Sequence, residues 1–166
     1  MNMQAALKHQ YHAALAMLKQ TLEQCPQEEW ARADDTVAFW RVAYHTLFFT
    51  HLYLQVNAEA FKPWKEHRAE HEYLGPMPWL QNRLPRIGAP YSKEQLLEYW
   101  ALCDGMVDKA VDTMDLTARE CGFPWYKLPK LEHQINNIRH VQHHAALLSG
   151  RLRKATGADI RWETMG

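Results

Sequence analysis

The sequence predicts an all-α protein, a four-helix bundle with a long irregular connection between its second and third helices. Three observations favour this fold class. Four segments place apolar residues at steps of three and four, no segment alternates like a strand, and five prolines interrupt residues 57–91. With 166 residues, of which 47% are hydrophobic, the chain is long enough to bury one core, so residues 1–166 are predicted to form a single domain.

Charge and cysteine content narrow the expected partners and compartment. Lys and Arg together number 19, as do Asp and Glu, and no basic block occurs, so neither nucleic acid nor an anionic membrane is an expected partner. The three cysteines, Cys25, Cys103 and Cys121, are widely spaced and odd in number, which favours a reduced cytoplasmic protein. No apolar run approaches about 18 residues, and the N-terminus lacks a basic segment before an apolar one, so we expect a soluble, untargeted protein.

The first helix is predicted by an apolar stripe that ends near Cys25 and Pro26. Its residues are Met3, Leu7, Tyr11, Ala14, Leu18 and Leu22. His9 and His12 lie off this stripe, so we expect both to be solvated surface residues.

The run TVAFWRVAYHTLFFTHLYLQV, residues 36–56, predicts the second helix, with Asp34 or Asp35 as its N-cap. His45 lies in the middle of an apolar stripe, so it is either a core residue with one hydrogen bond or, as a buried neutral imidazole, a metal ligand. The rest of the stripe comprises Ala38, Val42, Phe49, Leu52 and Val56. The opposite face is also apolar, which favours a central position or a dimer interface; it comprises Trp40, Ala43, Leu47 and Leu54.

Residues 57–91 form the long connection, with room for one short helix around Trp64 to Leu74. A connection of this length is typical of a lid or binding loop. Within it, His67 to His71 (HRAEH) matches the H-x-x-E-H spacing of one class of zinc peptidases, in which Glu70 would be the base. Those enzymes are much larger than this chain, so a solvated helix face is the favoured interpretation and a peptidase the minor one.

A capping box formed by Ser92 and Gln95 predicts the start of the third helix, and Cys103 lies on its apolar stripe as an expected core residue. The stripe comprises Leu96, Trp100, Cys103, Val107, Ala110 or Val111, and Met114. The connection that follows, residues 117–129, carries Trp125 and Tyr126 and could form another wall of a pocket.

The fourth helix is predicted from Leu131 to near Lys154, with Gly157 as its stop and a short tail after it. His140 and His144 lie one turn apart on one face, where two imidazoles can reach a common point, while His143 points elsewhere. The pair falls nearly opposite the main apolar stripe, so it lies either on the solvent-exposed surface or in the polar wall of a cleft. That stripe comprises Leu131, Ile135, Ile138, Ala145 and Leu152.

One imidazole from the second helix and two from the fourth would make a three-histidine metal site. Neutral ligands leave the charge of a dication uncompensated and keep a coordination position open, as in catalytic zinc sites. His45 and His51 lie about 240° apart on the helix, so they cannot both serve. Imidazole also suits nickel, copper and iron, and the ligand set alone does not identify the metal.

The runs WRVAYHTLFFTHLYL (residues 40–54) and NNIRHVQHHAALLSGRL (residues 136–152) resemble the DinB/YfiT-like superfamily of metal-binding four-helix bundles. In that family one histidine of the second helix and an HxxxH pair of the last helix hold a divalent ion, and these match His45, His140 and His144. The family often has an HHRGQ-like run where this chain has His143, His144 and then Ala-Ala-Leu.

The resemblance implies a metal-dependent transferase or isomerase that uses a small thiol such as bacillithiol, mycothiol or glutathione, although many relatives have no assigned reaction. We therefore expect zinc or nickel at the site, where it activates a thiol cosubstrate or water for attack on a small electrophile. Trp79, Trp125 and Tyr126 are the expected aromatic residues of a small-molecule pocket, and a homodimer is expected.

The alternative is a non-enzymatic dimeric helical bundle, in which the histidines are structural or lie on the surface. Two features favour it: the two-sided apolar second helix and the absence of an obvious general acid or base near the three histidines.

Overall fold

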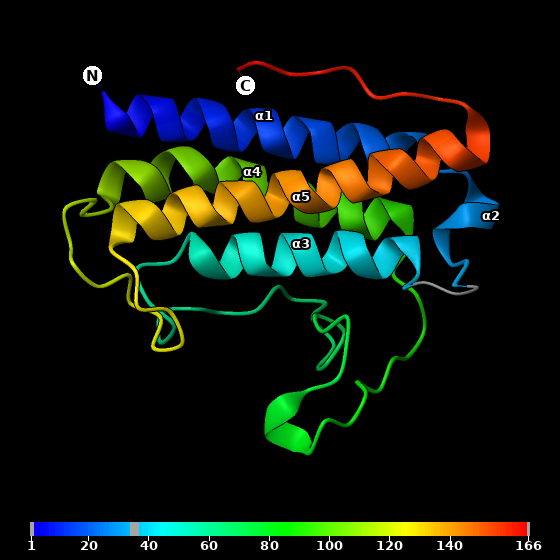
Figure 1. Cartoon of the computed structure of the whole chain (residues 1–166), viewed down its shortest axis with the longest axis horizontal. Coiled ribbons are helices and arrows are strands. Elements are labelled where there is room, and N and C mark those ends of the chain that lie inside the picture. The colour runs from blue at the N-terminus through cyan, green and yellow to red at the C-terminus, as the bar shows by residue number, and fades with distance from the viewer. Residues whose placement is uncertain (1, 34–36, 166) are drawn as a thin grey trace.

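The computed structural model describes residues 2–33 and 37–165, and it confirms the all-α prediction. The helices are α1 (Met3–Gln24), α2 (Gln27–Trp30), α3 (Phe39–Tyr53), a single 3-10 turn η1 (Pro78–Leu80), α4 (Lys93–Thr113) and α5 (Lys130–Thr156) (Figure 1). Within the described ranges, the one β-type pairing is an isolated bridge between Met77 and Arg83. No helix in these ranges is both long and apolar enough to cross a membrane.

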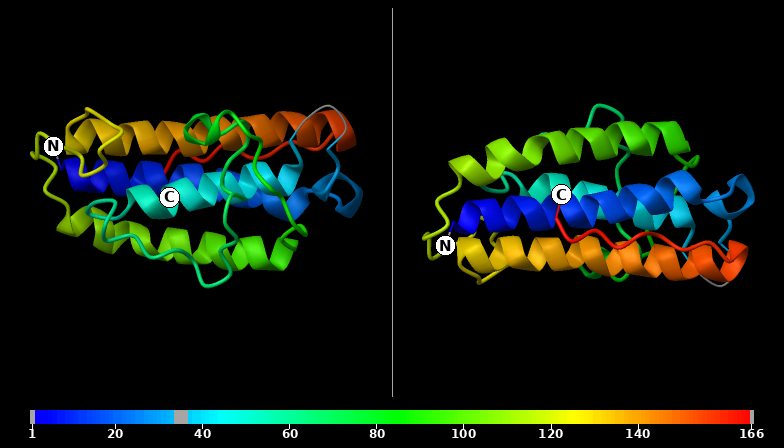
Figure 2. Two further views of the ribbon diagram at one scale, coloured as in Figure 1. Left: turned by 90° about the horizontal axis from the view of Figure 1, so that it is seen from below. Right: turned by 90° about the horizontal axis from the view of Figure 1, so that it is seen from above.

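The four long helices lie side by side, as the views in Figures 1 and 2 show. Helix α1 packs against α4 and α5, and α3 packs against the same two helices. Helices α1 and α5 run in one direction and α3 and α4 in the other. Because α3 and α4 run parallel, the chain between them must return along the whole length of the helices, and this is the role of the long connection.

Local sequence signals set most of the helix ends as predicted. The side chain of Ser92 accepts a hydrogen bond from the Gln95 backbone amide, and the Gln95 side chain accepts one from the Ser92 amide, which confirms the capping box. Helix α1 ends at Gln24, just before Pro26. Gly157 follows α5 with a φ of 75°, a left-handed conformation that glycine adopts without steric cost.

Helix α3 is shorter than predicted: it begins at Phe39 and ends at Tyr53, three residues before Val56. The expected N-caps, Asp34 and Asp35, lie outside the described residues. As predicted, α3 is covered on two sides, but the second cover is the chain's own long connection. Trp64 of the connection stacks on Tyr99 of α4 at 4.6 Å between ring centroids, and Tyr91 stacks on Tyr44 of α3 at 4.6 Å. Burial of α3 therefore does not require a second copy of the chain.

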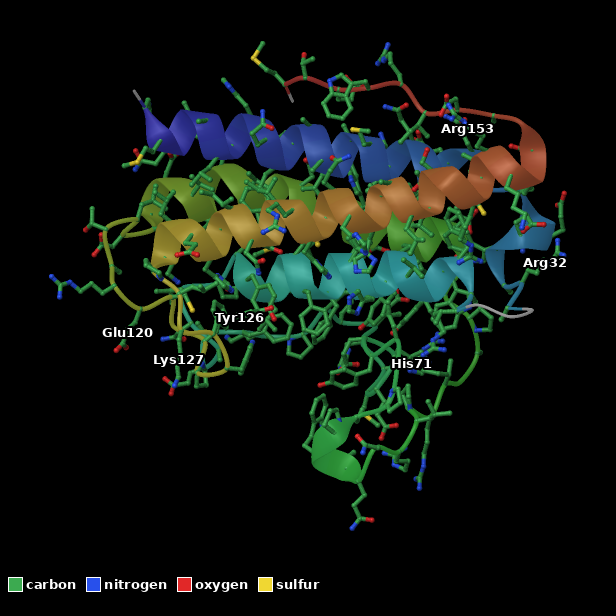
Figure 3. All side chains as sticks on the ribbon, in the orientation of Figure 1. Arg32, His71, Glu120, Tyr126, Lys127 and Arg153 are labelled. Carbon is green, nitrogen blue, oxygen red and sulfur yellow. The ribbon has the colours of Figure 1, made fainter. Side chains whose placement is uncertain are left out.

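The long connection is built from turns; the one short helix for which it had room around Trp64 to Leu74 does not form, and its single 3-10 turn lies at Pro78–Leu80. Its HRAEH segment is not helical, and its polar groups are engaged separately. His67 Nδ1 lies 2.6 Å from the Tyr44 hydroxyl, and Glu70 pairs with Arg83 at 2.7 Å. His71 lies beneath α3 (Figure 3), where its Nε2 accepts a hydrogen bond from the Gly88 amide at 3.2 Å. These side chains do not converge on one point, so nothing here supports the peptidase interpretation.

The buried face of α5 differs from the predicted stripe. Ile135 is 47% exposed and Leu131 and Ile138 are only half-buried, whereas the face turned to the core comprises His133, Gln134, Asn137, Val141, His144, Ala145, Leu148 and Leu152. A buried polar network explains the difference. The Tyr11 hydroxyl donates to Gln134 Oε1 at 2.7 Å and accepts from Asn137 Nδ2 at 3.0 Å. Hydrogen-bonded polar residues thus occupy core positions where the pattern anticipated apolar ones.

The cysteines, two histidines of α1 and the C-terminal tail complete the comparison with the sequence. Cys103 is fully buried in the core as predicted, and all three cysteines are unpaired. His9 is exposed as predicted, but His12 is half-buried, because its Nδ1 lies 2.7 Å from Asp104 Oδ1 on α4. The tail after α5 runs back along α1 (Figure 2, right), where the Gln20 side chain bonds to the Arg161 backbone.

Candidate metal centre

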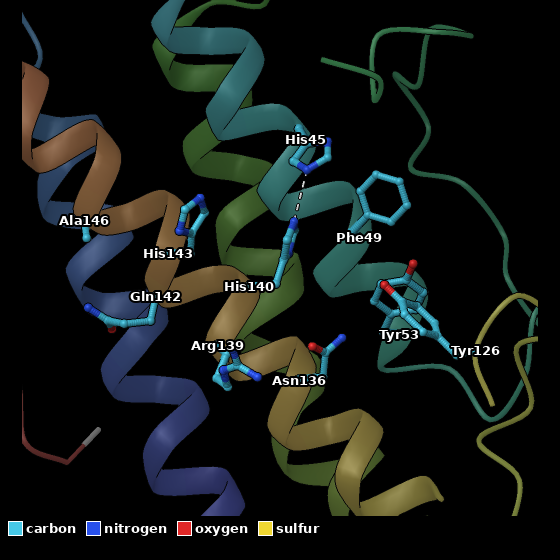
Figure 4. Close-up of a pocket in the computed structure, with 10 residues that line it drawn as sticks. All are labelled: His45, Phe49, Tyr53, Tyr126, Asn136, Arg139, His140, Gln142, His143 and Ala146. Atoms are coloured by element: carbon cyan, nitrogen blue, oxygen red, sulfur yellow. Dashed lines mark hydrogen bonds between the residues drawn. The ribbon is translucent and has the colours of Figure 1, made fainter. Parts of the chain in front are cut away.

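Three histidines converge where α3 and α5 face each other. His45 comes from α3, and His140 and His144 come from successive turns of α5. One ring nitrogen from each lies within 4.8 Å of the others, and within the described ranges this is the one group of three or more His, Cys, Asp or Glu side chains that could share an ion. Figure 4 shows His45 and His140 pointing at each other, with 3.0 Å between their Nε2 atoms. The three residues named from the sequence therefore do meet in space.

A backbone carbonyl of the long connection orients His45. Its Nδ1 lies 2.6 Å from the carbonyl oxygen of Glu72, so Nδ1 carries the proton and donates it to that oxygen. The Nε2 lone pair of His45 is then directed toward His140. Metal-binding histidines usually have such a partner on the second ring nitrogen, because it fixes both the tautomer and the ring orientation.

The three imidazoles are neutral near pH 7. Burial lowers the pKa of His45 to about 4, and the bond to the Glu72 carbonyl opposes this change. Burial likewise lowers the pKa of His140 and of His144 to about 3, with a smaller contribution from His45. Neutral imidazoles keep the lone pairs that a metal ion requires.

The residues fit a transition metal ion. Two ligand nitrogens in a tetrahedral site with bonds of about 2.0 Å stand about 3.3 Å apart, close to the 3.0 Å between His45 and His140. The widest separation, 4.8 Å, means that one ring must move inward by about 1.5 Å for the same geometry. Within the described structure, the buried Nδ1 atoms of His140 and His144 have no hydrogen-bond partner, so these two rings lack the orienting bond that His45 has. An all-imidazole set suits zinc, nickel, copper or iron.

A cavity of about 740 Å³, open to solvent, lies beside the three histidines. His45 and His140 contribute to its lining. Phe49, Tyr53 and Tyr126 form an aromatic wall, and the polar residues come from α5 and comprise Asn136, Arg139, Gln142 and His143 (Figure 4). None of the described residues that line this cavity is acidic.

The three aromatic residues expected at the pocket lie in different places. Tyr126 lines the cavity. Trp125 is 55% exposed and does not line it, but its Nε1 donates to the hydroxyl of Tyr53, which does, at 3.3 Å. Trp79 is 62% exposed on η1, packs against Tyr73 and does not line the cavity.

Sequence reasoning missed several lining residues that the helical period could have found. Phe49 and Tyr53 follow His45 by four and eight residues, so they share its side of α3. Asn136 precedes His140 by four residues on α5. The Glu72 carbonyl carried no such signal, because any residue type supplies a backbone oxygen.

His133 supports the aromatic wall from behind. It is fully buried, with its ring centroid 4.7 Å from that of Tyr53, 4.9 Å from that of Phe123 and 5.1 Å from that of Tyr126. Burial lowers the pKa of His133 to about 4, and the charge of Lys130, one turn earlier on α5, adds to the change. Its buried Nε2 has no partner among the described residues.

We expect the free energy of unfolding to fall as the pH drops from about 6.5 to about 4. In this range the unfolded chain protonates His133 while the folded chain keeps it neutral, so acid favours unfolding. The change from 6.5 to about 4 corresponds to roughly 3 kcal/mol at full protonation. Urea titrations between pH 7 and pH 4.5 measure this dependence. The buried histidines His45, His51, His140 and His144 add to the same dependence, because burial lowers the pKa of each. His133→Phe, which keeps a ring but cannot be protonated, should reduce the slope by the share of one histidine; an unchanged slope would contradict the assignment.

Comparisons of the chain with protein-family models, with curated proteins and with solved structures gave no match. The features of the chain that bear on function are therefore the three histidines, their hydrogen bonds and the adjoining cavity.

Proposed function

We propose that the chain is a DinB-like four-helix bundle that holds one divalent transition metal ion, zinc or nickel, on His45, His140 and His144. In this proposal the protein is an enzyme that activates a small thiol or water for transfer to a small electrophile. The single observation that supports it best is the convergence of three neutral imidazoles from two helices within 4.8 Å. A cavity of about 740 Å³ beside them leaves room for a small-molecule substrate.

The proposal assigns a role to the ion, to the Glu72 carbonyl and to the aromatic residues of the cavity. An ion held by three imidazoles keeps a coordination position open and lowers the pKa of the water or thiol that occupies it. The Glu72 carbonyl holds the proton of His45 on Nδ1, so Nε2 stays available as a ligand. Phe49, Tyr53 and Tyr126 shield one side of the cavity from water and offer contact to an apolar part of the substrate.

The proposal is tested first by the metal itself. Protein purified without an affinity tag should contain about one equivalent of a transition metal by mass spectrometry, as expected for a single three-histidine site. After exchange to cobalt(II), adding 2-mercaptoethanol should change the visible absorption, because a sulfur ligand alters the cobalt transitions. A protein that takes up no metal even after reloading would refute the proposal. Cobalt absorption bands that do not change when the thiol is added would favour water as the activated group.

The homodimer is a separate part of the proposal, and chelation distinguishes the two classes of function. Size-exclusion chromatography should show the same oligomeric state with and without a chelator if the ion is catalytic. A dimer that dissociates on chelation would favour the alternative, a non-enzymatic bundle with a structural ion. The two-sided burial of α3 no longer supports that alternative, because Trp64 and Tyr91 of the long connection cover the second face.

A further inference from the structure

The cavity and the proposed metal site carry a net positive charge. An imidazole binds a metal ion as a neutral ligand, so three histidine ligands would compensate none of the charge of a divalent ion. No acidic side chain lines the cavity within the described structure, whereas Arg139 does line it. A dication beside an exposed guanidinium, in a cavity with no carboxylate in its lining, favours an anionic ligand because opposite charges attract.

Arg139 differs from the arginines that have structural roles. Arg41 and Arg151 donate to the backbone carbonyls of Tyr73 and Val37, and Arg83 pairs with Glu70. Arg139 has no hydrogen-bond or ion-pair partner among the described residues. Its guanidinium can therefore present its paired N–H groups to an oxyanion, the geometry in which arginine binds carboxylate and phosphate.

Asn136 lies beside Arg139 on the same side of α5. The two residues are three apart, which makes them neighbours on a helix, and Figure 4 shows both side chains at the cavity below His140. In the described part of the chain, the Asn136 amide has no partner either. Its NH₂ group adds a neutral donor next to the guanidinium, so the pair offers donors from two side chains at one place.

The opposite wall of the cavity is apolar. Phe49 and Tyr53 project from α3, and Tyr126 projects from the connection before α5 (Figure 4). A ligand that fills the space between the two walls needs an anionic group on the α5 side and an apolar or aromatic body on the α3 side.

We infer that the cavity binds a small organic anion, whose carboxylate or phosphate is recognised by Arg139 and Asn136 and whose apolar body packs on Phe49, Tyr53 and Tyr126. The inference rests on the proposed metal site, since the ion supplies part of the positive charge. It narrows the substrate class from any small electrophile or thiol to one that carries an oxyanion.

Isothermal titration of the metal-loaded protein with three probes tests this inference. Phenylacetate, phenyl phosphate and phenylacetamide share a ring but differ in charge. We expect at least one anion to bind about tenfold more tightly than the neutral amide, as charge-assisted hydrogen bonds imply. The tighter of the two anions identifies a carboxylate or a phosphate as the natural group.

Arg139→Gln should remove most of this preference, a loss of about tenfold in anion affinity, and Arg139→Lys should retain part of it. Asn136→Ala should lower the affinity for the anion by about threefold. The matched control is Arg119→Gln, an exposed arginine that lines a different cavity, and it should leave all three affinities unchanged. Phenylacetamide binding should not respond to any of these changes.

Metal content measured on the same samples distinguishes two kinds of failure. If the wild type holds its metal but binds all three probes equally, or if Arg139→Gln keeps the preference, the inference about the anion is wrong and the metal site stands. If the wild type holds no metal, the proposed function fails first.

Discussion

Changing His140 to alanine is expected to leave the protein with less than about a tenth of the metal that the wild type retains. The three rings are about equally spaced, with centroids 5.0 Å apart for His45 and His140, 4.6 Å for His140 and His144 and 4.8 Å for His45 and His144. The loss of His140 leaves two imidazoles, which cannot complete a stable site. Losses at outer-shell partners alone typically cost about 10 to 100-fold in affinity, so removing a direct ligand should cost more.

The same experiment on His45 and His144 should give the same result, and His143→Ala provides the control. His143 lies next to His144 and lines the cavity, but it is exposed and does not belong to the converging group. Mass spectrometry should therefore find full metal content in His143→Ala. Circular dichroism of every variant checks that the helices persist, which alanine favours. Full metal in His140→Ala, or a loss confined to His143→Ala, would rule out the site.

Changing Trp64 to alanine is expected to produce the largest loss of stability of any single change in the long connection. Trp64 is 4% exposed and stacks on Tyr99 at 4.6 Å with ring planes 4° apart. Its ring also lies 5.7 Å from Tyr91, which stacks on α3 through Tyr44. Removing it leaves a cavity at the point where the connection is fastened to both α3 and α4. Such changes cost about 3 to 5 kcal/mol.

Trp79→Ala is the matched control, because Trp79 lies in the same connection but is 62% exposed. It should cost less than about 1 kcal/mol. Thermal unfolding with a chelator present compares the two without a contribution from bound metal. The melting temperature of Trp64→Ala should fall by roughly 10 °C and that of Trp79→Ala by no more than a few degrees. Equal melting temperatures would mean that the connection is not fastened to the helices through Trp64.

The sequence predicted those features that depend on neighbouring residues. Ser92 with Gln95, and Gly157, set helix ends through hydrogen bonds and backbone angles within one turn, so the pattern contains the full information. The pairing of His140 with His144 follows from the helical period alone. Its meeting with His45 depends on which helices pack together, which the helical period does not determine. The three-histidine site was therefore a hypothesis, and the resemblance favoured it.

The differences on α5 have one physical cause, which is that a buried position need not be apolar. Gln134 and Asn137 are fully buried and both bond to the Tyr11 hydroxyl, so the core face of α5 includes them and Ile135 is left exposed. His144 then lies on the buried side, not opposite it. In the long connection, aromatic stacking and backbone hydrogen bonds hold the chain against α3 and α4. Neither kind of contact produces a periodic sequence pattern, so the sequence could not predict this conformation.

The position of α1 has a consequence for synthesis on the ribosome. Its apolar face finds its main partners, α4 and α5, only after residue 93 has been made, whereas α1 itself ends at Gln24. At about 5 to 20 residues per second, this interval lasts roughly 3 to 14 s. During that time Leu15, Leu18 and Leu22, all fully buried in the folded protein, have no such partner. The nascent N-terminal helix is therefore an expected client of a chaperone that binds exposed apolar helices.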